Sequence, residues 1–430
     1  MARWEEKETE AILKGKNFIG EITAPPSKSC AHRRIIASCL GSSPTKIKID
    51  EICEDVKATI SCLRSMGAKF SYEDNILTVE PITSKGKMAF LNVKESSSTL
   101  RFMLPLSLVI CSEARITGEG SILLQPIEPL GGELKRKGFL FEGEKLPFTV
   151  KGDLKAGLYN LKGEVSSQFV SSLLMSLPLL ESDSEIVLSL PLFKESYVAL
   201  TIKILRECGI FIEKGPAGIF ICGNQRYSPA PRSFVEGDYS LAAFYLSLGC
   251  ARGEVKVTGL NPDSAQGERE IISIIRAFGG KVEREGSAFR AFRSSLKGTE
   301  LSLENTPDLI PPCIVLALFA EGETRLTGLK KLALKDDTRL KNLVENLKIL
   351  NADITRNKDE LIIRGNKPLR SAVVSSSFDH RIAMALACIS PLCEGGLTID
   401  NCEAVKRSYP SFFRDFTILG GITENTEEVF

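Results

Sequence analysis

A short pattern recurs along this chain and restricts the folds that are open to it. An alternating strand is followed by a helical stretch, which ends in an apolar residue, then Gly or Asn, then a small residue, before another strand begins. Four copies of roughly 25–30 residues fit the pattern, and they are Thr45–Ala68, Gly253–Gly280, Gly322–Ala352 and Leu397–Gly421. A chain that repeats in this way is built from copies of one supersecondary unit.

Each copy carries the local signals of a β-α-β unit. Gly or Asn directly after a helix can take the left-handed conformation that closes it, and the strand that follows alternates polar and apolar residues. The copies lie in both halves of a chain of 430 residues, which is too long for one core. We therefore predict an α/β (α+β) protein of two similar domains, each made of repeated βαβ-type units. A solenoid or one large sheet is the alternative, although solenoid repeats are more regular and uninterrupted.

Composition removes several classes of function. With 43% hydrophobic and 25% charged residues and a net charge of +1, the chain has the make-up of a soluble globular protein. It lacks the excess charge of a protein that binds nucleic acid or an acidic membrane. Two histidines, His32 and His380, leave almost no material for a histidine metal site or a Ser-His-Asp triad. The glycine-rich phosphate-binding motifs of nucleotide-binding proteins do not occur.

The cysteines and the first residues bear on the compartment. Twelve cysteines are scattered without a C-x-x-C pair, which argues against a zinc site or a redox pair. The opening MARWEEKETE is more charged than a signal peptide, and no apolar run reaches the ~18 residues of a transmembrane helix. We therefore expect a cytoplasmic protein with reduced, mostly buried thiols.

The segment PPSKSCAHRR, Pro25 to Arg34, is the strongest candidate for an anion site. Two prolines fix an extended approach, and Ser27 or Ser29 can then cap a helix. A helix start offers unpaired N–H groups and the positive end of the helix dipole, to which Lys28 and Arg33 add full charges. Taken alone, such a segment is more often an ordinary capped helix with solvated basic residues.

Further polar or basic helix starts follow along the chain. They are Ser166-Ser167-Gln168, Lys335-Asp336-Asp337-Thr338-Arg339, Asp379-His380-Arg381 and Lys406-Arg407 before Phe412. If these N-termini converge, they form a cleft for small polyanions, and Asp308 of Thr306-Pro307-Asp308 could be the carboxylate that faces it. Carboxylates and lysines positioned in such a cleft can move protons.

These segments, in this order, resemble the 3-phosphoshikimate 1-carboxyvinyltransferase (EPSP synthase) family. PPSKSCAHR resembles the family's P-S-K-S-x-x-x-R start, and ESSSTLRFMLPL, Glu95 to Leu106, resembles its E-S-G-S-T-L-R segment. The other matches are Ser166–Gln168, VEGDYS at Val235–Ser240, NPDSAQGE at Asn261–Glu268, TPD at Thr306–Asp308, the K-x-x-x-R of Lys335 and Arg339, DHRIAMAL from Asp379 and RSYPSFF from Arg407. Nine ordered motifs over nearly the whole chain make the resemblance specific for the fold.

The resemblance implies a fold and a reaction. The fold is that of the enolpyruvyl transferases, with residues 25–235 as an inserted domain, residues 1–24 and 236–430 as a discontinuous one, and the active site in the cleft between them. The reaction transfers the carboxyvinyl group of phosphoenolpyruvate to the 5-hydroxyl of shikimate 3-phosphate. It passes through a tetrahedral intermediate, releases phosphate and uses no metal or organic cofactor. It belongs to the shikimate pathway to chorismate and aromatic amino acids.

The resemblance also implies partners and site residues. The partners are the two substrates, with neither nucleic acid nor a membrane, and the protein is expected to be a monomer. Asp308 would accept the hydroxyl proton, and Lys28 and Asp336 are the candidates for protonating the methylene carbon. The residues implied for shikimate 3-phosphate are Lys28, Ser29, Arg33, Ser166, Ser167, Gln168, Lys194, Tyr197, Asp308, Lys331 and Lys335. Those implied for phosphoenolpyruvate are Lys28, Ser97, Gln125, Gln168, Arg339, Arg381 and Arg407.

Several matched positions depart from the family's pattern. Ser97 stands at a glycine, Gln125 at an arginine, Asp336 at a glutamate and Arg407 at a lysine. A side chain at position 97 narrows a tight pocket, and arginine keeps the charge of lysine but cannot donate a proton. Lys194, where a serine is usual, and Lys331 add positive charge on the shikimate 3-phosphate side. We therefore expect weaker phosphoenolpyruvate affinity and reduced glyphosate sensitivity, with shikimate 3-phosphate binding preserved.

Two other functions stay open at this point. One is a catalytically impaired relative that binds shikimate 3-phosphate or a similar phosphorylated ligand. The other is the sister UDP-N-acetylglucosamine 1-carboxyvinyltransferase, which usually carries a reactive cysteine in a loop that here, at Gly118–Pro126, has none. That sister family also has Lys-Asn where this chain has Lys28-Ser29. The presence of Asp308 favours an active enzyme, because binding alone would not need a base.

Overall fold

The structure is a computed structural model that describes residues 10–161, 166–188, 195–215, 218–330, 332 and 334–424, without the side chains of residues 334 and 335. The chain divides into two compact units, Met1–Pro25 with Glu236–Phe430, and Pro26–Val235. We call the first the terminal unit, because it holds both chain ends, and the second the inserted unit. Each unit holds three four-stranded sheets in the described residues.

The inserted unit contains the sheets β14-β3-β5-β4, β6-β7-β9-β8 and β10-β11-β13-β12. Its strands are β3 (Thr45–Lys48), β4 (Lys69–Glu73), β5 (Ile76–Glu80), β6 (Gly86–Asn92), β7 (Cys111–Thr117), β8 (Leu140–Glu142), β9 (Phe148–Lys151), β10 (Gly157–Leu161), β11 (Ser184–Leu188), β12 (Ile212–Lys214), β13 (Gly218–Ile221) and β14 (Arg232–Phe234). Its helices are α1 (Lys28–Cys39), α2 (Glu54–Ser65), α3 (Ser97–Ile110), α4 (Leu130–Arg136), α5 (Ser167–Ser176) and α6 (Glu195–Glu207).

The terminal unit contains the sheets β2-β15-β17-β16, β18-β19-β21-β20 and β22-β23-β1-β24. Its strands are β1 (Glu10–Lys14), β2 (Phe18–Thr23), β15 (Gly253–Thr258), β16 (Lys281–Glu285), β17 (Ala288–Phe292), β18 (Glu300–Ser302), β19 (Glu323–Thr327), β20 (Asp353–Arg356), β21 (Glu360–Arg364), β22 (Val373–Ser375), β23 (Leu397–Asp400) and β24 (Ile422–Glu424). Its helices are α7 (Tyr239–Arg252), α8 (Ile271–Ala277), α9 (Ile310–Phe319), α10 (Leu334–Ile349), α11 (His380–Ile389) and α12 (Phe412–Ile418).

One topology recurs in these sheets. In β6-β7-β9-β8, β10-β11-β13-β12 and β18-β19-β21-β20, two parallel strands are joined through a helix, and a second helix leads to an antiparallel hairpin that completes the sheet, as in β6-α3-β7-α4-β8-β9. The other three sheets each take one strand from a distant part of the chain: β14 joins β3, β2 joins β15, and β1 lies between β23 and β24. The predicted α/β architecture of repeated βαβ-type units is confirmed.

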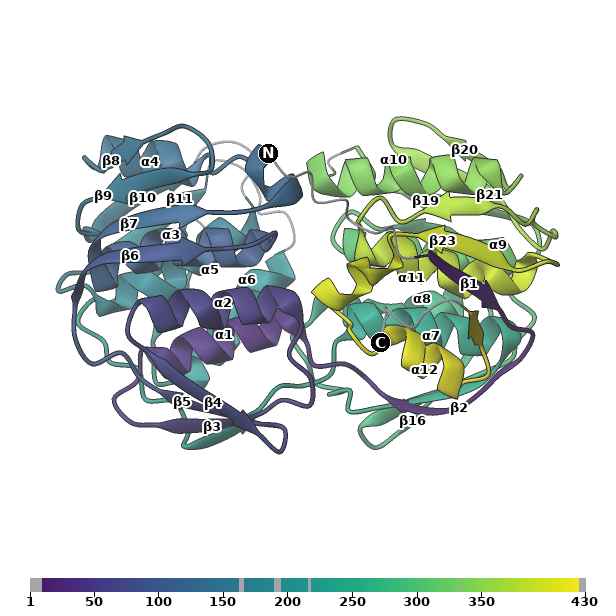
Figure 1. The fold of residues 1–430 in the computed structure, drawn as a ribbon, viewed down its shortest axis with the longest axis horizontal. Coiled ribbons are helices and arrows are strands. Elements are labelled where there is room, and N and C mark those ends of the chain that lie inside the picture. The colour runs from purple at the N-terminus through teal and green to yellow at the C-terminus, as the bar shows by residue number, and fades with distance from the viewer. Residues whose placement is uncertain are drawn as a thin grey trace, which may run out of the picture. The chain divides into compact units, whose positions relative to one another are not determined.

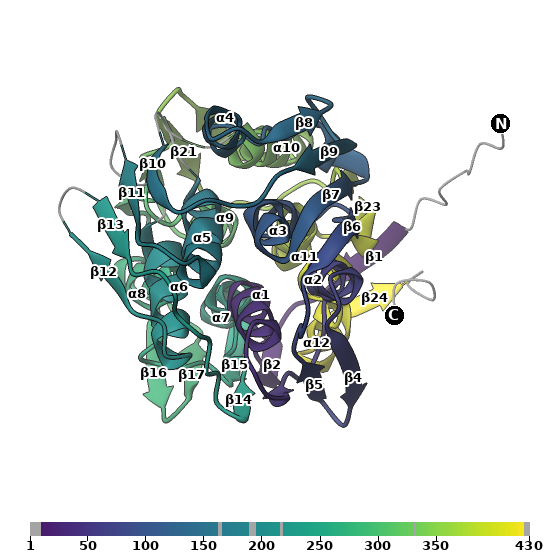
Figure 2. The same ribbon diagram turned by 90° about the vertical axis from the view of Figure 1, so that its left-hand side faces the viewer.

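The first helix of each repeat is buried and the second covers a sheet. In the terminal unit, α7, α9 and α11 pack against one another, and nearly all their residues are buried. Figure 2 looks along α1, α3 and α5 of the inserted unit, which lie inside a ring formed by that unit's three sheets, and Figure 1 shows the same elements from the side. The buried helices therefore form the centre of each unit, and the sheets surround them.

The sequence pattern marks the ends of the covering helices. A residue with positive φ follows each of them, and these residues are Gly67, Gly138, Gly209, Gly279, Asn351 and Gly420. The left-handed closures predicted for four copies are confirmed. The sequence pattern did not predict the copies β7-α4-β8 and β11-α6-β12, although their helices end in the same way.

The predicted basic helix start at Lys406-Arg407 is wrong. These two residues end a 3-10 helix, Cys402–Arg407, and α12 begins only at Phe412. At that place the positive charges lie near the C-terminal carbonyl groups, where cations are favourable. The other predicted starts are helix N-termini: α1 begins at Lys28, α10 at Leu334 and α11 at His380.

The cysteines are mostly buried in the structure. All twelve cysteines are free thiols, and eleven of them are buried. Burial raises the pKa of several, for example Cys208 to about 11, so these thiols stay protonated and unreactive at neutral pH. In the described part of the chain, no helix combines the length and the apolar character needed to cross a membrane.

Gly253 makes a close approach between two parallel strands. It pairs with Phe18 at the start of the β2-β15 ladder, and a Cβ there would stand 1.8 Å from the Phe18 carbonyl oxygen. We expect Gly253→Ala to lower the free energy of unfolding of the terminal unit by about 3 kcal/mol, because a backbone ladder must shift. Gly286→Ala, where a Cβ meets nothing within 4 Å but φ is +65°, should cost only about 1 kcal/mol. Urea denaturation measures both, and equal losses would contradict the steric argument.

Candidate active site

The N-terminus of α1 carries the first group of predicted residues. Ser27 caps the helix by accepting a hydrogen bond from the backbone N–H of Cys30 (3.5 Å). Lys28 opens the helix, and its ammonium donates to Oδ2 of Asp55 at 2.8 Å. Asp55 stands in the first turn of α2 and had no place in the sequence analysis. The Lys28 side chain stays 21% exposed, so it is oriented by a carboxylate and still within reach of a ligand.

Arg33 lies inside the inserted unit. Its Nε donates to Thr201 Oγ1 (2.6 Å), one Nη to the Ser29 carbonyl (2.8 Å) and the other to Ser171 Oγ (3.2 Å). Its guanidinium also stacks 5.1 Å from the centre of the Phe102 ring. Burial lowers the pKa of Arg33 to about 10. The structure thus engages this guanidinium with protein groups in the core, and its assignment to shikimate 3-phosphate stays a prediction.

His32 begins a chain of hydroxyl groups that links three helices. Its Nδ1 lies 2.8 Å from Thr59 Oγ1 of α2, which is 2.7 Å from Thr99 Oγ1 of α3. Thr99 in turn donates to Ser96 Oγ at 2.8 Å, and Ser96 caps α3. The chain holds the N-terminal halves of α1 and α3 in register, although the ring's Nε2 has no hydrogen-bond partner in the described residues. Burial lowers the pKa of His32 to about 3.

The start of α5 is a serine cap, as predicted. Ser166 accepts a hydrogen bond from the backbone N–H of Gln168 (3.3 Å), and Ser167 is buried. The Gln168 amide donates to Ser98 Oγ at 2.8 Å, so the side chain reaches across to the first turn of α3. The predicted residues of α5 and those of α3 therefore lie together in one group.

Two of the positions that depart from the family's pattern are bonded to each other. Ser97 Oγ donates to Oε1 of Gln125 at 2.7 Å, and Arg101 donates to the same oxygen at 3.1 Å. Arg101 also binds the Ser97 carbonyl (3.2 Å) and stacks on the ring of Phe169. Burial lowers the pKa of Arg101 to about 10. The amide oxygen of Gln125 is thus occupied by two donors at the start of α3.

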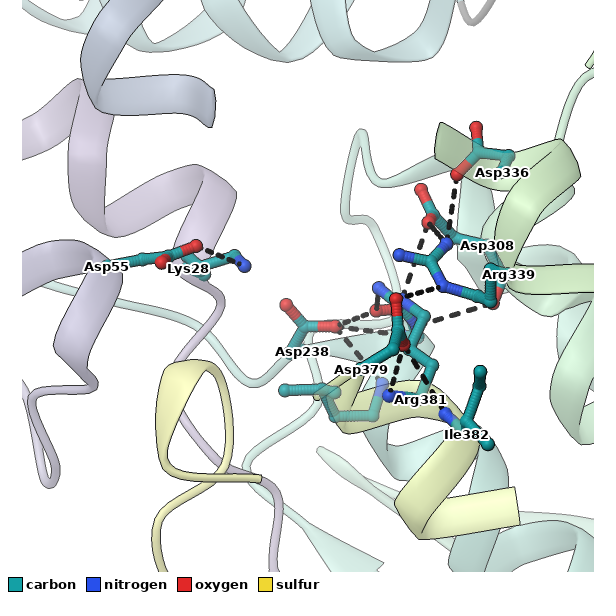
Figure 3. A network of polar contacts seen from close by, with 11 residues as sticks. Lys28, Asp55, Asp238, Asp308, Asp336, Arg339, Asp379, Arg381 and Ile382 are labelled. Atoms are coloured by element: carbon teal, nitrogen blue, oxygen red, sulfur yellow. Dashed lines mark hydrogen bonds and ion pairs between the residues drawn. The ribbon is translucent and has the colours of Figure 1, made fainter. Parts of the chain in front are cut away.

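Arg339 is the centre of the site in the terminal unit. Asp336, Asp379 and Asp308 all point toward it (Figure 3), at 2.9 Å from Nη1, 2.8 Å from Nε and 3.7 Å from Nη1 respectively. Only 5% of its side chain is exposed. Burial by itself would lower the pKa of Arg339, but the three carboxylates overcome that effect and hold the pKa above its ordinary value.

Arg381 stands beside Asp308 at the start of α11. Its Nε lies 3.4 Å from Asp308 Oδ1, Nη1 donates to the Asp308 carbonyl at 3.3 Å, and Nη2 donates to Ser240 Oγ at 2.9 Å. Asp379 caps α11 by accepting from the backbone N–H groups of Arg381 and Ile382, as Figure 3 shows. Asp308 thus contacts both guanidinium groups, and Asp379 binds Arg339 while it caps the helix that carries Arg381.

The remaining predicted residues are less closely placed. Tyr197 is half-buried on α6, and its carbonyl accepts from Thr201 at 2.8 Å. Arg407 donates to the Phe378 carbonyl at 3.4 Å. Lys194 and Lys331 lie outside the described residues, as does the side chain of Lys335.

The amino-acid sequence of this chain is similar to those of known proteins. The profile of the EPSP synthase (3-phosphoshikimate 1-carboxyvinyltransferase) family matches residues 12–416. The 3-phosphoshikimate 1-carboxyvinyltransferase of Clostridium perfringens strain 13 is 36% identical over 419 residues, which are 96% of this chain and 99% of that protein. The enzyme of the same name from Clostridium kluyveri is 36% identical over 406 residues, 94% of this chain and 95% of that one.

The chain belongs to the EPSP synthase family. The resemblance found in the motifs is thereby confirmed, and the chain is a transferase of the shikimate pathway of aromatic amino acid biosynthesis. Among solved structures, an EPSP synthase from Acinetobacter baumannii superimposes with a TM-score of 0.80 at 24% identity, covering 97% of this chain and 100% of that one. The enolpyruvyl transferase NikO from Streptomyces tendae gives 0.76 at 17% identity, with 97% and 98% covered. Both likenesses show the enolpyruvyl transferase fold.

The buried His32 predicts a particular response to acid. Its pKa is about 3 in the folded chain against 6.5 in a free side chain, so below pH 6.5 the unfolded chain binds a proton that the folded chain refuses. Stability therefore falls as the pH falls from 6.5 toward 3, by up to about 1.4 kcal/mol per pH unit from this group. Asp55, Lys28 and Arg33 are the charged groups that act on the ring.

We expect His32→Asn to flatten this dependence. The variant keeps a polar group near Thr59 but cannot titrate, so its stability should fall less steeply between pH 6 and pH 4. Urea denaturation at pH 7, 6, 5 and 4 gives the two slopes. Parallel slopes for the variant and the natural chain would show that His32 does not set the acid response.

Proposed function

We propose that this chain transfers the carboxyvinyl group of phosphoenolpyruvate to the 5-hydroxyl of shikimate 3-phosphate, with release of phosphate. The observation that carries the proposal is the 36% identity to 3-phosphoshikimate 1-carboxyvinyltransferases over 96% of the chain. The described residues add the chemistry that such a reaction requires: a lysine oriented by a carboxylate, and a carboxylate set between two guanidinium groups.

Asp308 is the base in this proposal. It stands in the first turn ahead of α9, beside Arg339 and Arg381. These two cations stabilise its charged form, and 14% of its side chain is exposed against 5% for Arg339. A charged, partly exposed carboxylate at a helix start can take the proton of a substrate hydroxyl within hydrogen-bond reach.

Lys28 is the proton donor that the contacts favour. Its side chain donates to Asp55, which fixes its direction. Asp336, the other candidate, lies 2.9 Å from Nη1 of Arg339, so its carboxylate is committed to that guanidinium. We therefore assign protonation of the methylene carbon to Lys28 and the positioning of Arg339 to Asp336.

We also propose the residues that bind the anionic groups of the substrates. In the inserted unit, the starts of α1 and α5 carry Ser29, Ser166, Ser167 and Gln168, and we assign these to shikimate 3-phosphate with Arg33, Tyr197, Lys194, Lys331 and Lys335. In the terminal unit we assign Arg339, Arg381 and Arg407 to phosphoenolpyruvate, together with Ser97, Gln125 and Gln168 of the inserted unit. We further propose a cytoplasmic monomer, which the free, buried thiols support.

Phosphate release from the purified chain tests the function. We expect release only when shikimate 3-phosphate and phosphoenolpyruvate are both present, because each alone lacks a reaction partner. Asp308→Asn should lower kcat by at least about a hundredfold, the usual share of a general base. Asp353→Asn, a surface carboxylate paired with Lys367, is the matched control and should keep kcat unchanged. No release, with shikimate 3-phosphate binding still seen by calorimetry, would identify a ligand-binding relative that has lost its chemistry.

The bonded pair Ser97 and Gln125 predicts weaker phosphoenolpyruvate binding and weaker glyphosate inhibition. Gln125 supplies no charge, and its amide oxygen is occupied by Ser97 and Arg101. We expect the double variant Ser97→Gly, Gln125→Arg to lower both the KM for phosphoenolpyruvate and the glyphosate Ki on the order of tenfold, the value of one hydrogen bond to a charged group. The KM for shikimate 3-phosphate serves as the internal control. Unchanged constants would mean that the pair does not weaken binding.

A further inference from the structure

Ser240 connects a helix cap to the guanidinium of Arg381. It lies in the first turn of α7 and is buried, with 4% of its surface exposed. Its hydroxyl donates its one proton to Asp238 Oδ1 at 2.6 Å and accepts from Arg381 Nη2 at 2.9 Å. Because that proton is committed to a carboxylate, the lone pairs of the hydroxyl oxygen are left for the guanidinium. A hydroxyl group that donates to an anion also becomes a stronger hydrogen-bond acceptor.

The far end of this connection is fixed. Asp238 caps α7 and accepts from the backbone N–H groups of Ser240 (2.9 Å) and Leu241 (3.2 Å). Its own N–H donates to the carbonyl of Pro25 at 2.8 Å. Asp238 is thus held by its helix on one side and by the segment that follows β2 on the other, and 7% of its surface is exposed.

A neighbouring carboxylate anchors the same stretch of chain. Glu236 accepts from the amides of Gln266 (2.8 Å) and Asn261 (2.7 Å) and from the hydroxyl of Ser264. Gln266 also donates to the Gly237 carbonyl at 2.9 Å and accepts from the Tyr239 N–H at 3.1 Å. The segments VEGDYS and NPDSAQGE, to which the sequence analysis gave no role, therefore form one rigid support around the start of α7.

We propose that Ser240 is a positioning residue for Arg381. The guanidinium is long and flexible, and three contacts fix it: Ser240 Oγ at Nη2, the Asp308 carbonyl at Nη1 and the Asp308 carboxylate near Nε. Two of these contacts come from Asp308, which the reaction itself uses as a base. Only the carboxylate of Asp308 changes charge during turnover, and Ser240 supplies the side-chain contact that does not, so Arg381 keeps its direction toward the anionic substrate when Asp308 takes a proton.

The inference rests on the proposed function, because it concerns the binding of phosphoenolpyruvate by Arg381. We expect Ser240→Ala to raise the KM for phosphoenolpyruvate about tenfold, the value of a hydrogen bond to a charged group. The KM for shikimate 3-phosphate should stay within twofold and kcat within threefold. Asp238 keeps its two backbone donors in this variant, so the fold should be retained with a Tm only a few degrees lower.

Three further variants separate positioning from a general loss of stability. Ser240→Thr keeps the hydroxyl and should bind phosphoenolpyruvate like the natural chain. Ser247→Ala, on the same helix, removes a buried hydroxyl that has no partner among the described residues and should leave both KM values unchanged. In an Arg381→Lys background, which lacks Nη2, Ser240→Ala should have little effect on the KM for phosphoenolpyruvate.

The outcomes are distinct. If the natural chain releases no phosphate with both substrates, the proposed function fails before Ser240 is tested. If it is active but Ser240→Ala leaves the KM for phosphoenolpyruvate within twofold, Ser240 does not position Arg381. The same conclusion follows if both KM values rise together, if the effect is undiminished in the Arg381→Lys background, or if Ser240→Thr behaves like Ser240→Ala.

Discussion

The buried guanidinium of Arg339 is the constraint on which the terminal unit's site depends. A cation with 5% of its side chain exposed is stable only when carboxylates compensate for the lost water, and removing one partner of such a pair typically costs about 3–5 kcal/mol. Here Asp308, Asp336 and Asp379 supply the compensation. Each comes from a different helix start, so the ion cluster fixes the N-terminal ends of α9, α10 and α11 to one another.

The buried helices of the two units begin at residues of different charge. Each has three buried helices whose first N–H groups need acceptors. In the inserted unit the caps of these helices are neutral, Ser27, Ser96 and Ser166. In the terminal unit α7 and α11 are capped by aspartates, Asp238 and Asp379, and Asp308 lies in the 3-10 turn ahead of α9. Serine caps leave the positive helix ends available to an external anion, whereas aspartates neutralise them and recruit Arg339 and Arg381 instead.

The sequence predicted the repeat because its signals are local. Gly or Asn after a helix and alternation along a strand depend on a few neighbouring residues, and both survive in four of the six copies. The copy β7-α4-β8 was missed because a 3-10 helix, Gly120–Leu124, and a loop separate its strand from its helix. The contacts within the candidate site could not be predicted in this way. Lys28 was found from its motif, but its partner Asp55 lies 27 residues away, and nothing in the spacing connects them.

Contacts between distant residues are what the motifs could not predict. Arg33 has the sequence signature of a surface cation at a helix start, yet partners 138 to 168 residues distant draw it into the core. The helix start predicted at Lys406-Arg407 fails for a local reason, because these residues end a 3-10 helix and α12 starts only at Phe412. The bond between Ser97 and Gln125 also joins residues 28 positions apart. Such contacts are set by packing between repeats, which a pattern within one repeat does not contain.

The pairing of β1 bears on the order in which the two units fold during synthesis. It is the first described strand to leave the ribosome, yet it pairs with β23 and β24, which are among the last. The inserted unit, by contrast, is continuous in sequence and contains all three of its sheets by Phe234. Because domains fold as their chain emerges, the inserted unit can be complete while β1 still waits for its neighbours. The terminal unit can complete its sheet β22-β23-β1-β24 only after β24 has been made, so it closes later in synthesis than the inserted unit.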